Sequence, residues 1–378
     1  NIRMFFFCYI FNFFYEFLNG IRIVSGVATM KSVQPVLANI LIEAESKNVI
    51  KLTATDLDLT ISTEVDAQIE VEGSITLPSK KLNDIFTRLS ENLVTFELNE
   101  ETNIVEISTK NTKFEIVGIS ASEFPKVAEN VSLENGIDID FKQFTRAIKQ
   151  AGFAAASYET TGPLSGVVCD IKEEILEIAS TDGNRLARVR EKIDNIEKKT
   201  SQLIIPSRTL QEVLKISGFV EDEKIKIYTE KTKLAIKTSK TLMISKIIEG
   251  HYPDYNKLIP ETSPKTATVN RNELISALEL ISVMVNEKTC IIKFEFTENK
   301  LEVKADTSDS GKGKKDLDIE YKDEDLVIAF NYKYVLDGLK NMEDEKVLIG
   351  LNTKASPTVF RPDSENDYIS LVMPVQIR

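Results

Sequence analysis

Histidine and cysteine are nearly absent from this chain of 378 residues. His251 is the only histidine, so a catalytic triad or metal cluster built on several histidines is excluded. The three cysteines, Cys8, Cys169 and Cys290, lie far apart and form no C-x-x-C pair. The chain therefore indicates neither a zinc site nor a disulfide framework. We expect no metal and no cofactor, and a reducing cytoplasm as the simplest location.

An excess of positive charge is also missing. The 59 acidic residues outnumber the 47 lysines and arginines, and the formal net charge is −12. This balance argues against a protein that coats nucleic acid over its whole surface. A local basic face on an acidic exterior remains compatible with weak DNA contact that tolerates sliding.

Long hydrophobic runs are lacking as well. The longest, from Met4 to Phe14, holds about 10 apolar residues, whereas a membrane-spanning helix needs about 20. No small-residue cleavage site of a signal peptide follows it. We interpret the run as a buried opening strand, or a peculiarity of the start of the chain, rather than a targeting segment, and we expect no membrane partner.

Internal repeats dominate what is present. An amphipathic helix pattern begins at Pro78, Pro206 and Phe330, about 125 residues apart. A second helix pattern, starting at Tyr15, Phe141 and Asn270, and a turn rich in Thr and Asp, starting at Ala54, Ser180 and Ala305, keep the same period. The first set opens on polar or capping residues: Ser79, Ser207 and Asn331. Three independent markers with one period predict three tandem repeats of one structural unit.

Short alternating apolar segments between the helices predict strands. Each unit thus carries two helices and antiparallel sheets, which is the α+β class. We predict three domains, at residues 1–133, 134–264 and 265–378. Like domains joined head to tail curve, and the curve can close into a ring, alone or after dimerisation.

If the repeated helices line the inner wall of such a ring, their exposed residues should be basic. The first helix offers only Arg22, and Glu212 and Asp337 interrupt the pattern. The basic candidates are Lys80, Lys81, Arg88, Arg146, Lys149, Arg208, Lys215, Lys333 and Lys340.

Two segments imitate phosphate chemistry. Asp56 to Thr60 reads D-x-D-x-T, a pattern in which one aspartate attacks phosphate. That chemistry needs a parallel strand followed by a helix, but a strand-like segment follows here. The glycines and lysines from Asp309 onward lack the phosphate-binding loop spacing, so we predict a flexible hairpin or loop. We expect no catalytic residue.

Four segments resemble the bacterial replicative sliding clamp, the beta subunit of the replicative DNA polymerase. The segments are TATDLDLTIS (53–62), STDGNRLA (180–187), EGHYPDYNKLIP (249–260) and LVMPVQI (371–377). The resemblance runs from about Gly26 to the C-terminus. It implies three tandem clamp domains in a head-to-tail homodimeric ring that encircles duplex DNA without reading its sequence. It also implies no catalytic activity, and as partners the polymerase catalytic subunit, the clamp loader and other proteins with a clamp-binding motif.

The resemblance further implies three sets of site residues. A peptide-binding pocket would use Leu164, Thr181, Gly183, Asn184, Arg185, Leu186, Pro253, Lys257, Leu258, Leu371, Met373 and Pro374. DNA-facing positions would be Lys31, Lys80 and Arg208. The dimer contact would join Phe114 and Ile116 to Val283 and Met284. The pocket has sensible chemistry, because Leu, Met and Pro make an adaptable apolar cleft, while Arg185 and Lys257 could orient polar groups of the peptide. Leu186, Leu371 and Met373 could equally be core.

This sequence departs from the family at the pocket. Asn184 stands where the family has histidine, and Lys257 and Gln376 stand where it has arginine, so peptide preference is expected to differ. Two other hypotheses stay open at this point. One is a repeat-built protein-interaction scaffold that never encircles DNA, and the other is a phosphate-transferring enzyme using Asp56 and Asp58.

Overall fold

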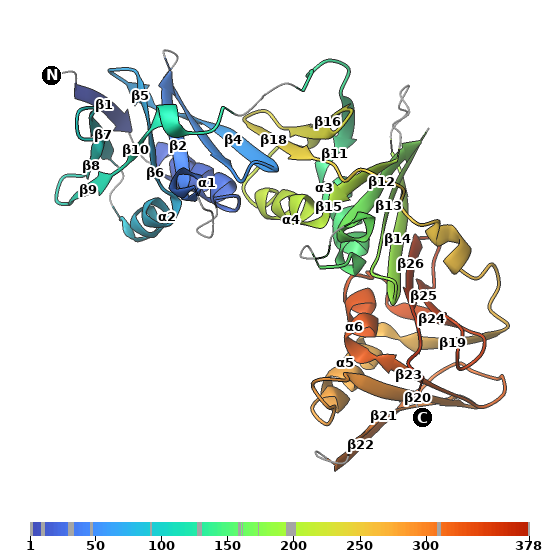
Figure 1. Ribbon diagram of the computed structural model, residues 1–378. Helices are drawn as coiled ribbons and strands as arrows, with labels where there is room; N and C mark the ends of the chain where they lie inside the picture. The colour runs from blue at the N-terminus through green and yellow to red at the C-terminus, as the bar shows by residue number, and fades with distance from the viewer. Residues whose placement is uncertain are drawn as a thin grey trace. The chain divides into compact units, whose positions relative to one another are not determined.

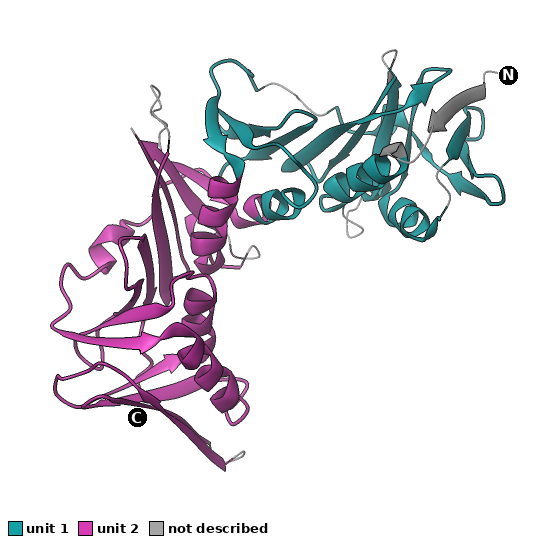
Figure 2. Ribbon diagram, turned by 180° about the vertical axis from the view of Figure 1, so that it is seen from behind, with its two compact units in different colours: residues 1–141, 211–247 teal, residues 142–210, 248–378 magenta. Residues whose placement is uncertain are grey.

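The protein divides into two compact units in the computed structural model (Figure 2). One unit holds residues 1–141 and 211–247, and the other holds residues 142–210 and 248–378. The structure describes residues 3–8, 12–28, 34–45, 48–90, 93–126, 131–157, 160, 162–172, 174–193, 202–307 and 311–376.

Six α-helices lie in these described ranges, on the six segments whose repeating pattern predicted them (Figure 1). They are α1 (Asn12–Ser25), α2 (Ser79–Arg88), α3 (Phe141–Ala151), α4 (Ser207–Ile216), α5 (Arg271–Ser282) and α6 (Tyr332–Lys340). Asn331 caps α6, since its side chain accepts the Lys333 N–H at 3.1 Å. Ser79 instead lies inside the first turn of α2, and its hydroxyl donates to Ser25 Oγ at 3.0 Å.

The first unit contains a nine-stranded and a five-stranded sheet. The larger runs in the order β10 (Ile119–Ser120), β6 (Gly73–Pro78), β2 (Asn39–Glu45), β3 (Val49–Thr55), β4 (Leu59–Asp66), β18 (Thr241–Lys246), β17 (Lys233–Lys237), β16 (Lys224–Glu230) and β11 (Ile137–Asp140). The smaller runs in the order β5 (Gln68–Ile69), β1 (Arg3–Cys8), β7 (Val94–Asn99), β8 (Ile104–Ser108) and β9 (Lys113–Val117).

Helices α1 and α2 fill the core of this unit. The ring centroid of Phe17 in α1 lies 4.9 Å from that of Phe86 in α2 and 5.4 Å from that of Phe96 in β7. Gly20 lets α1 lie directly on the large sheet, because a Cβ there would come within 2.8 Å of a Val65 methyl carbon. The apolar faces predicted for these helices are therefore buried.

The second unit contains an eight-stranded and a four-stranded sheet. The larger runs in the order β15 (Leu203–Pro206), β12 (Gly166–Lys172), β13 (Ile175–Thr181), β14 (Arg185–Lys192), β26 (Asp367–Val372), β25 (Thr358–Pro362), β24 (Lys346–Leu351) and β19 (Lys265–Asn270). The smaller runs in the order β22 (Gly311–Asp318), β21 (Lys300–Thr307), β20 (Ile291–Thr297) and β23 (Leu326–Asn331).

Every strand pairing among the described residues that gives a register is antiparallel, which confirms the α+β class with antiparallel sheets. Both large sheets join strands of two consecutive repeats, across β4 and β18 in one unit and across β14 and β26 in the other. The compact units therefore do not coincide with the three repeats.

Two segments were interpreted from the sequence as a strand and as a hairpin or loop. The apolar run at the start is strand only over Arg3–Cys8, paired with β7, while Phe14 already belongs to α1. The Gly- and Lys-rich segment belongs to a hairpin, the first of its two predicted forms, because Gly311–Asp318 form β22 and pair along their whole length with the preceding strand β21. Lysines alternate there with glycines on an edge strand, a placement that suits charged residues.

Candidate functional site

A tight turn links β13 to β14 and is built by its own side chains. Asp182 Oδ1 accepts the backbone N–H groups of Asn184 and Arg185 at 2.9 and 3.1 Å. Thr181 Oγ1 donates to the Arg185 carbonyl oxygen at 2.6 Å and accepts the Gly183 N–H at 3.1 Å. Gly183 has φ +90°, a conformation that glycine adopts without strain. The T-D-G-N-R segment is thus a self-contained hairpin tip.

Strand β26 extends the sheet beside this hairpin. Leu186 lies opposite Leu371 in the register of β14 and β26. Beyond the end of β26, the Met373 N–H donates to the Asn184 carbonyl oxygen at 2.8 Å. The pairing brings the second and fourth resembling segments, more than 180 residues apart, to one place. This juxtaposition makes a shared surface from two repeats.

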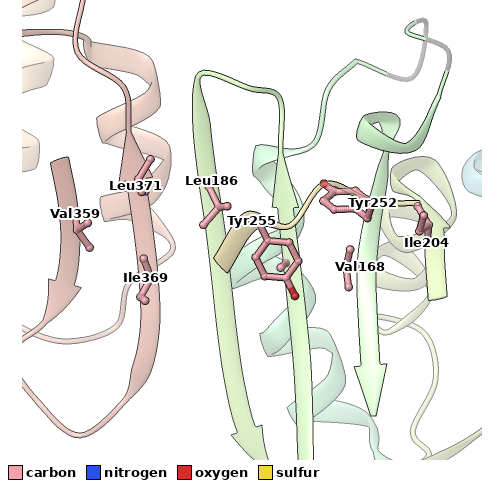
Figure 3. Packing of buried hydrophobic residues seen from close by; sticks show 9 residues of the cluster. Val168, Leu186, Ile204, Tyr252, Tyr255, Val359, Ile369 and Leu371 are labelled. Atoms are coloured by element: carbon pink, nitrogen blue, oxygen red, sulfur yellow. The ribbon is translucent and has the colours of Figure 1, made fainter. Parts of the chain in front are cut away.

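An apolar cluster lies on this seam, as Figure 3 shows. Its buried members are Val168, Ala179, Leu186, Ile204, Tyr252, Tyr255, Val359, Ile369 and Leu371, with Leu164, Ile248 and Ile259 packed against them. The rings of Tyr252 and Tyr255 meet edge to face, with centroids 6.1 Å apart. The Y-P-D-Y segment thereby anchors the stretch before β19 to the seam.

Both tyrosine hydroxyls have polar partners. Tyr252 Oη accepts the Thr181 N–H at 3.0 Å, and burial raises the pKa of Tyr252 to about 12. Tyr255 donates to the Glu177 carboxylate, which also accepts a hydrogen bond from Arg190. Burial, and then the hydrogen bond to Glu177, raise the pKa of Tyr255 further. Both phenols are therefore neutral near pH 7 and hold the cluster in place.

The twelve predicted pocket residues differ in exposure. Thr181, Leu186 and Leu371 are buried, the two leucines at 1% and 2% exposure. Leu164, Arg185 and Pro374 are half-buried. Gly183, Asn184, Pro253, Lys257, Leu258 and Met373 are exposed. The leucines of β14 and β26 are therefore core, whereas Met373 and Leu258 present apolar surface to solvent. The peptide-binding role of all twelve stays a prediction.

Arg185 and Lys257 have different surroundings. The Arg185 guanidinium donates to Asp182 at 3.1 Å, to Asp337 at 2.5 Å and to the Phe153 carbonyl oxygen at 3.0 Å. It also lies over the ring of Tyr334, 4.6 Å from the centroid. Lys257 is 82% exposed and forms an ion pair with Asp254 at 3.2 Å. Only Lys257 keeps its charge at the surface, so it is the better placed of the two to meet a ligand.

No cluster of three or more His, Cys, Asp or Glu that could hold a metal occurs in the part of the chain that the structure describes. Asp56 and Asp58 lie in the turn between antiparallel β3 and β4. Asp56 Oδ1 accepts the N–H groups of Asp58 and Leu59 at 3.0 and 2.8 Å, so this aspartate builds a turn. Phosphotransfer by these residues has no support, because the sheet is antiparallel and no helix follows.

Three sequence models of one family match this chain. They are described as DNA polymerase III beta subunit, N-terminal, central and C-terminal domain, and match residues 14–128, 138–254 and 256–376. The chain belongs to the DNA polymerase III beta subunit family. The proposed clamp fold, with three domains of helices and antiparallel sheets, is thereby confirmed.

Known sliding clamps resemble this one along nearly their whole length. The beta sliding clamp of Synechococcus elongatus is 33% identical over 371 residues, covering 96% of this chain and 98% of the relative. The crystal structure of the beta subunit from Thermotoga maritima has a TM-score of 0.90 at 26% identity, covering 99% of this chain and 100% of that one. A Pseudomonas aeruginosa sliding clamp bound to griselimycin has a TM-score of 0.89 at 25% identity, with the same coverage.

This protein is accordingly a sliding clamp of DNA replication, a processivity factor and not an enzyme. Within the described ranges, no helix of the clamp is long and apolar enough to cross a membrane.

The predicted DNA-facing and dimer residues lie on other elements. Lys80 is exposed on α2 and Arg208 is half-buried on α4, while Lys31 lies outside the described residues. Phe114 and Ile116 lie on β9, at the edge of the five-stranded sheet. Val283, 78% exposed, and Met284 follow α5. These roles stay predictions.

The two acidic residues that interrupt the basic helix faces do not present free charge. Glu212 is buried and its carboxylate accepts from Lys215 at 2.6 Å, and Asp337 is paired with Arg185. The pairing of Glu212 with Lys215 has the i,i+3 spacing of neighbours on a helix, whereas the pairing of Asp337 with Arg185 joins residues 152 positions apart and could not be predicted from the sequence. Sequence reasoning also omitted Tyr252 and Tyr255 from the pocket, although the quoted Y-P-D-Y motif contains both.

Proposed function

We propose that this clamp closes with a second copy, head to tail, into a ring around duplex DNA. Three domains, at residues 1–133, 134–264 and 265–378, would form each half of the ring. The observation that carries the proposal is that two of the edge strands, one in the first repeat and one in the third, have exposed apolar residues beside them. Strands β9 and β22 each have one described neighbour, and they belong to the first and third repeats. Exposed edges invite pairing, and a closed ring covers them.

Apolar residues beside these edges support the same closure. Val117 of β9 is 68% exposed, and Val283 after α5 is 78% exposed. A cavity of about 390 Å³ lies between the end of α2 and β9, lined by Ile85, Leu89 and Phe114 among others. We propose that Val283 and Met284 of the second copy contact Phe114 there, and that the predicted contribution of Ile116 is indirect, because this residue is only 4% exposed.

Basic side chains on the exposed helix faces support contact with the DNA backbone. Lys80, Lys142 and Lys149 are exposed, and lysine contacts to phosphate carry no sequence information. Together with Lys31 and Arg208, they would let the ring slide along any duplex. The acidic remainder of the surface limits tight static binding.

The seam between β14 and β26 supports the tethering role. Its buried leucines give a firm apolar base, and exposed Met373 and Leu258 give an adaptable rim for a peptide anchor. The polymerase catalytic subunit, the clamp loader and other proteins with a clamp-binding motif would compete for it, in the cytoplasm. We propose griselimycin, which a Pseudomonas aeruginosa clamp binds, as the probe for this site.

The test is loading onto DNA with a clamp loader and ATP. The clamp is loaded onto nicked circular plasmid, the plasmid is then cut once, and retention is followed by gel filtration. We expect retention on the circle and release after cutting. A Val283→Glu variant that cannot close is the matched control and should be absent from both. Equal binding to circular and linear DNA would contradict topological tethering.

A further inference from the structure

The turn between β3 and β4 repeats, bond for bond, the turn of the peptide-binding seam. Thr55 Oγ1 donates to the Leu59 carbonyl oxygen at 3.2 Å and accepts the Leu57 N–H at 3.0 Å. Asp56 Oδ1 accepts the next two N–H groups, as Asp182 does in the other turn. The Lys246 N–H donates to the Asp58 carbonyl oxygen at 2.9 Å, in the manner of Met373 and Asn184.

The side chains on this common frame are different. Thr60 and Ile244 pair across β4 and β18 where Leu186 and Leu371 pair across β14 and β26. Lys246 takes the position of Met373. The first unit therefore holds a second site with the backbone of the peptide seam and a more polar lining.

Leu57 occupies the tip of this turn in a strained conformation. Its φ is +77°, at the position where the other turn has Gly183 with φ +90°. The left-handed region costs a residue with a side chain about 1–2 kcal/mol, which glycine would avoid. The Leu57 side chain is 50% exposed, so burial in the core does not offset this strain. Backbone strain of this kind clusters at binding sites.

A cavity of about 220 Å³ lies beside Leu57. Its lining residues are Thr55, Leu57, Asp58, Thr60, Pro125, Lys126, Lys233, Ile244 and Lys246. Three lysines face one aspartate there, on a chain whose net charge is −12. The cavity is smaller than a site for a drug-sized ligand and suits one or two side chains.

The charges of this cavity can be exchanged. Asp58 pairs with Lys246 at 2.7 Å, but their side chains are 77% and 58% exposed. Exposed ion pairs contribute little free energy, so a carboxylate from a guest could replace Asp58 as the partner of Lys246.

We propose that this cavity binds a short segment of a partner protein in which a carboxylate neighbours an aliphatic or aromatic side chain. The lysines receive the carboxylate, and Leu57, Pro125 and Ile244 receive the apolar group. A nucleic-acid phosphate fits less well, because it would leave Leu57, Pro125 and Ile244 without an apolar partner, and the turn's N–H groups already bind Asp56 and Thr55. The site would give each clamp chain a second contact point, separate from the β14–β26 seam.

Methyl NMR of the full-length clamp tests this site directly. The probe is the blocked dipeptide acetyl-Glu-Leu-amide, and the control is acetyl-Gln-Leu-amide. We expect the acidic probe to shift the methyl signals of Leu57 and Ile244 and to leave those of Leu371 in place. The neutral probe should shift them far less at equal concentration. Equal response to both probes, or response at Leu371 alone, would overturn the proposal.

Two variants and a competitor complete the test. Lys246→Glu reverses the charge of one lining residue. It should weaken binding of the acidic probe at least about tenfold, because one strong contact is lost. Leu57→Gly removes the apolar side chain at the tip and keeps the conformation of the turn, so binding of the probe should weaken to a similar degree. The variant should unfold at the same or a higher temperature, because glycine relieves the backbone strain. Displacement of the probe by a short oligothymidylate would identify a phosphate site and refute a peptide site. Unchanged affinity in both variants would also refute it.

Discussion

Arg185 and Asp337 join strand β14 of the second repeat to helix α6 of the third. The Arg185 guanidinium donates to Asp337 at 2.5 Å, and its side chain is only 14% exposed. Further hydrogen bonds to Asp182 and the Phe153 carbonyl oxygen, and the Tyr334 ring, fill the remaining space around it. Each of the three guanidinium nitrogens reaches a different acceptor, so the site needs a planar cation with donors in three directions, which lysine cannot replace.

Removing this link is expected to destabilise the second unit. Arg185→Lys and Asp337→Asn should each lower stability, and a double-mutant cycle should give a coupling of about 1–3 kcal/mol, as for hydrogen bonds to charged groups. The measurement is urea unfolding. The exposed pair of Arg88 and Asp84, at 3.1 Å, is the matched control and should couple by less than about 1 kcal/mol. Equal coupling in the two pairs would show that Arg185 acts as an ordinary surface cation.

Mutations should distinguish the buried residues of the β14–β26 seam from the exposed ones. Leu371 is 2% exposed, so Leu371→Ala should cost about 2–5 kcal/mol of unfolding free energy through the cavity it leaves. Met373 is 36% exposed, so Met373→Ala should change stability by less than about 1 kcal/mol. Griselimycin binding, followed by calorimetry, should nevertheless weaken at least about tenfold in Met373→Ala. A Met373→Ala clamp that binds griselimycin like the unmodified protein would exclude this rim from the pocket.

Ring closure should depend on Val283. A carboxylate in its place would be desolvated against the apolar residues beside β9, so Val283→Glu should raise the dimer dissociation constant at least about a hundredfold, roughly 3 kcal/mol. Analytical ultracentrifugation measures this shift. Ile175, 44% exposed on β13, provides the control, and Ile175→Glu should remain as dimeric as the unmodified clamp. The interface is misplaced if both variants behave alike.

Alkaline pH should loosen the seam through its tyrosines. Burial raises the pKa of Tyr252 to about 12, above the value of about 10 in an unfolded chain. The neutral phenol therefore contributes stability that is fully present below pH 10 and is lost as pH rises toward 12. Burial also raises the pKa values of Tyr255 and Tyr368, so the second unit should lose stability steeply above pH 10.

Tyr252→Phe separates the contribution of one ring. Loss of the Thr181 N–H contact should cost about 1–2 kcal/mol at pH 7. Between pH 10 and 12 the variant should lose stability less steeply than the unmodified clamp, by up to about 1.4 kcal/mol per pH unit. Identical pH dependence in thermal unfolding would show that Tyr252 ionises freely in the folded clamp.

The repeat and most of its elements follow from local patterns in the amino-acid sequence. Helical spacing and a period shared by three markers placed all six helices, because amphipathic faces and turn residues are local properties of the chain. Two of the three predicted turns rich in Thr and Asp, those from Ala54 and Ser180, follow equally from the sequence, since an aspartate side chain binds the N–H groups that follow it. In the third, Ala305 to Thr307 belong to β21 and the next residues lie outside the described part of the chain. Resemblance then identified the family from four short segments.

Tertiary structure decided which of these residues do what. Only the tertiary structure shows that Leu186 and Leu371 are buried while Met373 is exposed. Only three-dimensional packing pairs Arg185 with Asp337, which lie 152 positions apart, and only packing buries Glu212. The strain at Leu57 is likewise invisible in the sequence, because a backbone dihedral is fixed by the surrounding turn and sheet and not by the residue that occupies it.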